Sequence, residues 1–249
     1  MNAPASTFTA TGILLALTLA TAQPADGKVS FWERLKKIAG ISATPSLMKG
    51  TDDDMPNGGQ IWAGTPDTGR SQSITHDSGF RSPVFAPDGN AVLAIKSNAI
   101  WRIPLAGGAP FKFHEMAGLS KLVGFDRDDT NQLCVLLGQE SAISVQLLSV
   151  VTLQAVPIEY DAGSREDRRW VAHLKRWDRS YGETMVYLEK QRKTGLSSEV
   201  EWNDVYFKRR NETPINVSRA DGKNCGHPSL APNGTQVVFI KDIGPGEAQ

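Results

Sequence analysis

The sequence has few of the features that mark an enzyme or a metalloprotein. It contains two cysteines, Cys134 and Cys225, and no Cys-x-x-Cys motif, so zinc-ribbon and thioredoxin chemistry have no support. It has no Gly-x-Ser-x-Gly elbow, phosphate-binding loop, zinc-protease motif or dinucleotide fingerprint. Its four histidines lie far apart and lack the spacing of a metal-ligand set. We therefore expect no cofactor, no metal and no catalytic residues.

An excess of charge is also missing, since 27 basic residues balance 27 acidic ones. A neutral chain has no electrostatic reason to bind nucleic acid or an anionic membrane. The remaining composition is spread evenly, with 23 glycines and 14 prolines placed as single turn residues along the chain. Such spacing favours many short strands joined by turns.

Long apolar runs are absent apart from one near the N-terminus, at residues 13–20. This run has the length of a signal-peptide core and is too short to span a bilayer. Ala20-Thr21-Ala22 then supplies a small-x-small cleavage site, so residues 1–22 are expected to be a signal peptide of a periplasmic or secreted protein. Residues 1–12 lack Lys and Arg, which leaves a buried or uncleaved, membrane-held N-terminus as the alternative.

Residues 23–59 are expected to form a helix and linker arm. A helix is predicted over 31–39, where a capping box precedes apolar residues at helical spacing and Gly40 ends the run. A helix this short is marginal alone, so its apolar stripe must dock. Trp32 and Leu35 are therefore candidate partner-binding residues, with packing on the chain's own domain as the alternative.

One segment of the sequence is written twice. Residues 82–96, SPVFAPDGNAVLAIK, recur at 227–241 as HPSLAPNGTQVVFIK. Each copy predicts a short strand, a Pro-Asx-Gly turn and a second, apolar strand. Repetition of a unit this size is typical of an array fold.

From Gln60 onward the pattern predicts only strands. Two are expected within 60–75, and the rest fall in sets at 83–86, 91–95, 99–105 and 110–113; at 121–125, 133–138, 144–150 and 154–158; at 171–175, 184–189, 203–208 and 214–217; and at 228–231 and 236–241.

The strand count implies a closed ring. The last copy has two strands and lacks the outer two, while residues 60–75 form an outer hairpin without inner strands. Joining the two ends completes one more blade and leaves no open sheet edge. We therefore expect an all-β fold over 60–249, a small β-propeller of four blades closed between its N- and C-terminal strands. A fifth blade within 159–202 stays an alternative.

These motifs resemble the TolB-like β-propeller repeat, and the resemblance covers residues 60–242. Blades of that family carry a Pro-Asp-Gly turn, an Ile-Tyr pair and a Gly-Gly turn, and the matching residues here lie at 86–89, 100–101, 107–108, 204–207 and 231–234. The resemblance implies a periplasmic scaffold for protein binding. Members of the family are usually longer and have more blades.

Two groups of residues are candidates for partner binding on such a propeller. Loops that enter the innermost strands surround the central channel, and the repeat places Ser82, Lys121, His173 and His227 near those entries. Arg81, which precedes Ser82, is a candidate as well. Basic groups there would bind an anionic group or an acidic side chain, whereas ordinary solvated loops would account for the same residues.

The second group lies in 165–179, where arginines and lysines alternate with tryptophans. Arg and Trp are enriched at binding hot spots, so Arg176 and Trp177 are candidate partner contacts. A strand with Trp facing the core and Arg facing water is the alternative explanation. Nucleic acid does not suit an exported, neutral protein.

Together these patterns predict an exported, non-enzymatic propeller that binds an envelope component or a secreted effector. The alternative is a propeller enzyme, or a binder of carbohydrate or another small ligand, that uses the channel mouth. The cysteines are expected to be unpaired, although an exported protein can also join them in a disulfide.

Overall fold

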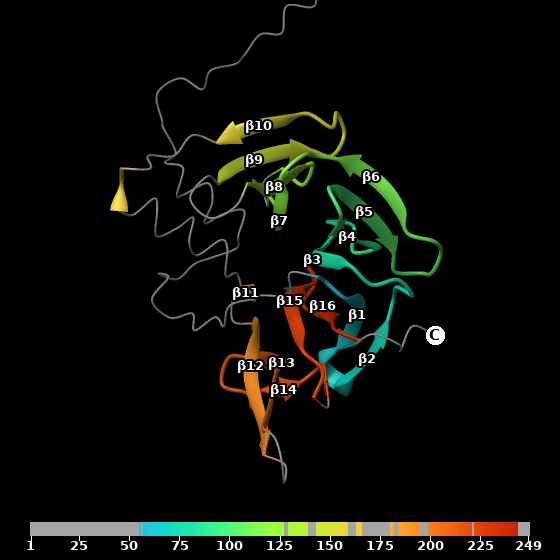
Figure 1. Cartoon of the computed structure of the whole chain (residues 1–249), viewed down its shortest axis with the longest axis vertical. Helices are drawn as coiled ribbons and strands as arrows, with labels where there is room; N and C mark the ends of the chain where they lie inside the picture. The colour runs from blue at the N-terminus through green and yellow to red at the C-terminus, as the bar shows by residue number, and fades with distance from the viewer. Residues whose placement is uncertain are drawn as a thin grey trace, which may run out of the picture.

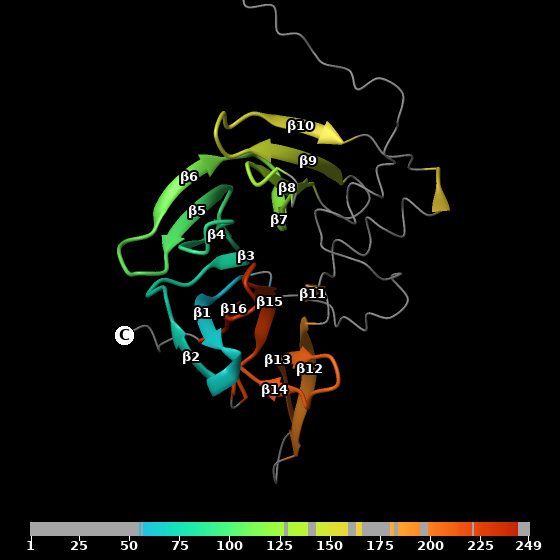
Figure 2. The ribbon, with the colours of Figure 1, turned by 180° about the vertical axis from the view of Figure 1, so that it is seen from behind.

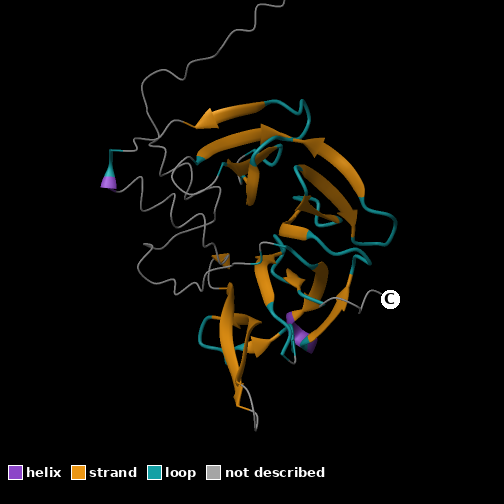
Figure 3. Ribbon diagram, viewed as in Figure 1, coloured by secondary structure: helices purple, strands orange, loops and turns teal. Residues whose placement is uncertain are grey.

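The computed structural model describes residues 55, 57–126, 129–138, 143–158, 163–165, 180–181, 184–194, 199–220 and 222–243. These residues are nearly all strand and turn, as Figure 3 shows. One short 3₁₀ helix, η2 (Pro66–Thr68), lies between the first two strands. The expected signal peptide and the helix over 31–39, with Trp32 and Leu35, lie outside the described residues and stay predictions.

The strands form four antiparallel sheets of four strands each (Figure 1). The first sheet contains β3 (Phe80–Phe85), β4 (Ala91–Lys96), β5 (Ala99–Pro104) and β6 (Phe111–Glu115). The second sheet contains β7 (Leu119–Phe125), β8 (Gln132–Leu137), β9 (Ser144–Ser149) and β10 (Ala155–Ile158). The third sheet contains β11 (Ser180–Tyr181), β12 (Thr184–Thr194), β13 (Glu199–Arg209) and β14 (Ile215–Asn216).

The fourth sheet, called the split sheet below, is built from both ends of the described chain. Its order is β15 (Cys225–Leu230), β16 (Val237–Lys241), β1 (Gln60–Thr65) and β2 (Arg70–Ser73). β1 runs antiparallel to β16, with Ile61 opposite Ile240 and Trp62 opposite Phe239. The prediction that residues 60–75 pair with the C-terminal repeat copy is therefore confirmed.

A cation–π contact repeats the same pattern in two sheets. In the first sheet Lys96 Nζ lies 4.8 Å from the ring centroid of Phe80 and 6.0 Å from that of Trp101. In the split sheet Lys241 Nζ lies 4.6 Å from the centroid of Trp62. Each such contact contributes about 0.5–1 kcal/mol. Lys96 and Lys241 occupy the same place in the two repeat copies, so β1 stands where β5 stands in the uninterrupted sheet.

The sheets pack side by side, mainly through β3, β7 and β15 (Figures 1 and 2). β3 packs against β15 and β16 on one side and against β7 on the other, while β15 also contacts β12 and β13. The order in space is therefore third, split, first and second sheet. Buried apolar clusters fill the interfaces between the described sheets. Each contains a fully buried side chain: Phe239 between the third and split sheets, Ile240 between the split and first sheets, and Leu93 between the first and second sheets.

Most expected strands match the observed ones in place, but β3 begins at Phe80 and β15 at Cys225, ahead of the predicted 83–86 and 228–231. β12 and β13 are several residues longer at the end where they join than the predicted 184–189 and 203–208. The strand expected at 171–175 lies outside the described residues, and β11 is the first strand of the third sheet. Most of the chain between β10 and β11 is not described, so ring closure and blade count belong to the proposal below.

Both cysteines are buried and neither forms a disulfide, as the sequence predicted. Cys134 lies in β8 and Cys225 begins β15, so they belong to different sheets. Burial raises the pKa of the Cys225 thiol to about 12, against the opposing charge of Lys241.

We expect Cys225 to resist alkylation while the protein is folded. Because a thiolate is the reactive form, a pKa raised from 9.0 to about 12 slows reaction near neutral pH by about a thousandfold. The measurement is iodoacetamide labelling, with each cysteine followed separately by peptide mass spectrometry. Labelling of the same thiol in urea is the control, and equal rates in the two states would contradict the expected burial.

Candidate functional site

The first strands of neighbouring sheets carry irregularities at related positions. The pairing register shifts in β3 between Arg81 and Val84 and in β15 between Gly226 and Ser229, and β7 is irregular as well. Bulges of this kind redirect side chains, and they are common next to binding sites. Two of the bulges contain a residue of positive φ: Ser82 in β3, with a φ of 47°, and His227 in β15, with a φ of 49°.

Three of the predicted channel residues lie on these strands. Arg81 and His227 are half-buried on β3 and β15, and Lys121 on β7 is only 9% exposed. A lysine this buried needs polar partners, and Lys121 does interact with neighbouring groups. β3 packs between β15 and β7, so the three residues belong to adjacent strands. Their role in partner binding stays a prediction.

His173, Arg176 and Trp177 lie outside the described residues. Their proposed roles at the channel mouth and in a protein-binding surface therefore also stay predictions.

The most exposed feature of the described chain is the long hairpin of β12 and β13, called the ribbon below. Its base is covered, because β11 pairs with Thr184 and Met185 and β14 pairs with Tyr206 and Phe207. Beyond that base, β12 pairs with no described strand except β13. Figure 1 shows the ribbon projecting below the rest of the molecule. The stretch of β12 from Val186 to Thr194, which no described strand pairs on that side, is called the β12 edge.

Alternation along the strands anchors the ribbon at one end and exposes it at the other. On one face the base residues are apolar and fully or almost fully buried, and they pack against the split sheet: Val186, Leu188, Val205 and Phe207. The same face becomes charged toward the tip. Lys190 and Arg192 lie on β12, and Glu199 and Glu201 lie on β13.

Ion pairs join the charged residues across the ribbon. Lys190 pairs with Glu201, while Arg192 lies 2.7 Å from Glu201 and 2.8 Å from Glu199. Hydrogen bonds from Lys190 and then Arg192 lower the pKa of Glu201. The pairs are solvent-exposed, so water and salt screen them. They leave β12 with basic side chains along its edge and β13 with acidic ones.

The other face of the ribbon is stiffened by two tyrosines. The rings of Tyr187 and Tyr206 stack with centroids 5.9 Å apart and an interplanar angle of 22°. Gln191 Nε2 donates to Tyr206 Oη at 3.4 Å. Burial, and then the charge of Glu189, raise the pKa of both phenols, so they stay neutral. Side-chain contacts therefore join the two strands of the ribbon on both faces.

A buried carboxylate fixes the chain that follows the ribbon. Asp204 on β13 is 4% exposed. One of its oxygens accepts from Ser218 Oγ at 2.7 Å and from the backbone N–H of Ala220 at 2.9 Å. The other accepts from Asn216 Nδ2 at 2.9 Å. These bonds tie the β14–β15 connection to the ribbon base.

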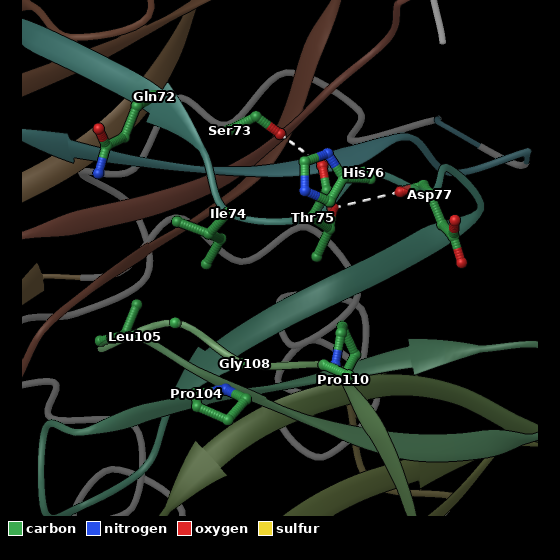
Figure 4. A pocket seen from close by; sticks show the side chains of 12 residues that line it. Gln72, Ser73, Ile74, Thr75, His76, Asp77, Pro104, Leu105, Gly108 and Pro110 are labelled. Atoms are coloured by element: carbon green, nitrogen blue, oxygen red, sulfur yellow. Dashed lines mark hydrogen bonds between the residues drawn. The ribbon is translucent and has the colours of Figure 1, made fainter. Parts of the chain in front are cut away.

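A separate pocket of about 530 Å³ lies between the end of β2 and the β5–β6 turn (Figure 4). Thr75 holds one wall, since its Oγ1 accepts from Ile61 N–H at 2.9 Å and donates to the carbonyl of Asp77 at 3.2 Å. Pro104, Leu105 and Pro110 form an apolar opposite wall. Sequence patterns do not predict this pocket, because its walls come from two turns that carry no motif of their own.

The described part of the chain does not assemble a metal site or a membrane span. Among these residues no three His, Cys, Asp or Glu side chains gather in a way that would hold a metal ion. No helix within the same ranges is long and apolar enough to cross a membrane.

No protein-family model and no curated protein matches the chain. Among solved structures it is similar to a protein described as TolB from Agrobacterium tumefaciens, at 14% identity and a TM-score of 0.35, covering 71% of this chain and 59% of that one. It is also similar to TolB from Acinetobacter baumannii, at 14% identity and a TM-score of 0.34, covering 74% and 46%. The tricorn protease matches at 10% identity and a TM-score of 0.27, covering 73% and 20%.

These likenesses are remote, and this chain spans less than two thirds of the length of each of the three proteins. The matches therefore carry no argument about activity. The assignment of an all-β, propeller-like fold rests on the strand pairing of the chain itself.

Proposed function

We propose that this chain is an exported, non-enzymatic β-propeller that binds another protein, either an envelope component or a secreted effector. Its ring closes between the second and third sheets, through the residues that link β10 to β11, to give four blades or a fifth in that link. The observation that supports protein binding is the ribbon.

Natural sheets seldom leave a long edge uncovered, because an unpaired row of N–H and C=O groups is a template for another strand. Among the described residues no strand pairs with the β12 edge, and the base of the ribbon is anchored in a buried cluster. Addition of a partner strand to such an edge is a recurring mode of peptide recognition. The ribbon is therefore the part of the described surface best suited to hold a protein partner.

The test is affinity capture from an envelope extract with the mature chain and with a shortened variant. Gln191 and Trp202 lie opposite each other, so joining them through an Asn-Gly turn removes residues 192–201 and keeps the buried base together with Trp202, which packs against it. We expect the full chain to retain a specific protein and the shortened chain to lose it, with the unfolding midpoint nearly unchanged.

A His76→Ala variant, altered in the separate pocket, serves as the matched control and should capture the same protein as the full chain. Recovery of no protein would overturn the proposal. Equal recovery by the shortened chain, or turnover of a small substrate instead, would also overturn it.

A further inference from the structure

We propose that the pocket of Figure 4 binds a small, uncharged molecule with an aliphatic body and one hydrogen-bonding head group. The pocket lies between the split sheet and the first sheet, whereas the ribbon belongs to the third sheet. The inference therefore goes beyond the proposed function and concerns a separate site. The volume of about 530 Å³ lies within the usual range of small-molecule sites, which is about 300–1,000 Å³.

The apolar part of the lining is continuous with the protein core. Ile74 follows β2 and Leu105 begins the β5–β6 turn, and both are half-buried and pack against the buried cluster between the split and first sheets. Figure 4 shows Ile74 pointing toward the wall that carries Leu105. Pro104 and Pro110 extend this apolar surface. An aliphatic group that fills the gap would leave water, which favours binding by about fourfold per buried methylene.

Two polar side chains at the rim can hold the head group of the ligand. Gln72 and His76 are exposed members of the lining, on the wall that faces the prolines. Neither side chain hydrogen-bonds to another described residue. An amide and an imidazole can each donate and accept, so together they suit a carbonyl, amide or hydroxyl group.

The lining offers no unpaired charge to a ligand. Apart from the His76 imidazole, Asp77 is the only ionisable side chain among the described residues that line the pocket, and its carboxylate pairs with Lys96 Nζ at 3.0 Å. A charged ligand would lose water without gaining an opposite charge. These lining residues also include no Phe, Tyr or Trp ring on which a flat ligand would stack. The chemistry of the lining therefore favours an uncharged, aliphatic ligand.

Hydrogen bonds fix the shape of the polar wall before a ligand arrives. Besides the two bonds of Thr75, Ser73 Oγ donates to the carbonyl of Thr75 at 2.6 Å. Gln60 Nε2 donates to the carbonyl of His76 at 2.8 Å. These side-chain bonds hold the backbone on either side of His76, so this wall is a fixed turn.

The opposite wall is also fixed. The φ angles of Pro104 and Pro110 are set by their rings, and Leu105 N–H donates to the carbonyl of Asn90 at 2.9 Å. Gly108 has a φ of 116°, which favours glycine at this point of the turn. Because both walls are already ordered, a ligand binds without a large cost in conformational entropy.

The test uses butanamide, hexanamide and octanamide as probes of the full chain. Binding is followed through the methyl NMR signals of Ile74 and Leu105. We expect the affinity to rise about fourfold per methylene and to be unaffected by salt, because no ion pair forms. Hexanoate and hexylammonium should bind about fivefold more weakly than hexanamide, because neither charge finds a partner.

Variants of exposed residues assign the binding to this pocket. Gln72→Ala removes one contact to the head group and should weaken hexanamide binding about fivefold. Gln154→Ala is the matched control, because Gln154 is exposed in the β9–β10 turn and does not line the pocket. Ala109→Phe adds a ring to the lining and should weaken octanamide binding more than butanamide binding. Gln72 and Ala109 are exposed, so thermal unfolding should be unchanged in both variants.

Affinity that does not change with chain length would overturn the inference. Equal binding by Gln72→Ala and by the full chain, or tighter binding of a charged probe, would also overturn it. None of these results affects the proposed function, which is tested by capture through the ribbon. Loss of ribbon-dependent capture, with the amide series behaving as expected, would count against the proposed function alone.

Discussion

Phe239→Ala is expected to lower the free energy of unfolding by about 3–5 kcal/mol. Phe239 lies at the centre of β16, is fully buried, and belongs to the apolar cluster between the split and third sheets. Its loss leaves a cavity where the C-terminal strand faces both β1 and the third sheet. Urea unfolding followed by circular dichroism measures the change.

Phe111→Ala is the matched control, because the Phe111 side chain on β6 is 49% exposed. We expect that variant to change stability by about 0.5 kcal/mol or less. A loss in Phe239→Ala as small as that in Phe111→Ala would show that the Phe239 side chain does not lie in the core. Cys225→Ala tests the same cluster at its edge, and a smaller loss is expected there because fewer atoms are removed.

Asp204→Ala is expected to cost about 3 kcal/mol of stability, since it leaves several buried donors without an acceptor. Ser218 Oγ, the N–H of Ala220 and the amide of Asn216 all donate to this carboxylate. Without it the β14–β15 connection loses its attachment to the ribbon base. Amide hydrogen exchange at Ala220 should accelerate along with the drop in the urea midpoint.

Asp204→Asn is the conservative control, because one oxygen remains to accept while the new NH₂ cannot. We expect it to lose about half as much stability as the alanine variant. If exchange at Ala220 stays slow in Asp204→Ala, the carboxylate does not hold this connection. The predicted loss would then need another cause.

The third sheet shows which strands a sequence pattern can locate and which it cannot. Alternating apolar residues predicted strands at 184–189 and 203–208, which are the anchored parts of β12 and β13. The stretch from Lys190 to Thr194 has no apolar alternation, so no strand was expected there. In this stretch ion pairs between β12 and β13 join the two strands instead. Such pairs depend on the register between two segments. The ribbon could be found only once that register was known.

The sequence does not predict the pocket of Figure 4, for a related reason. Thr75 appears in the sequence as an ordinary loop threonine, yet it is 3% exposed and bonds to the backbone of β1. The repeat predicts Lys121 as a channel residue but does not predict that its side chain is buried. Burial of a polar side chain depends on which strands pack around it, and local patterns do not contain that information.

The sequence by itself determined that this protein is built from short antiparallel strands, and that its two ends complete one sheet. It did so because the Pro-Asx-Gly turn and the apolar strand after it are local features, and because the two copies show which strands are missing. The tertiary structure alone decided which side chains are buried and how far the third sheet's two long strands extend. Those properties arise where β13, β14 and β15 meet, among residues whose partners lie in other strands.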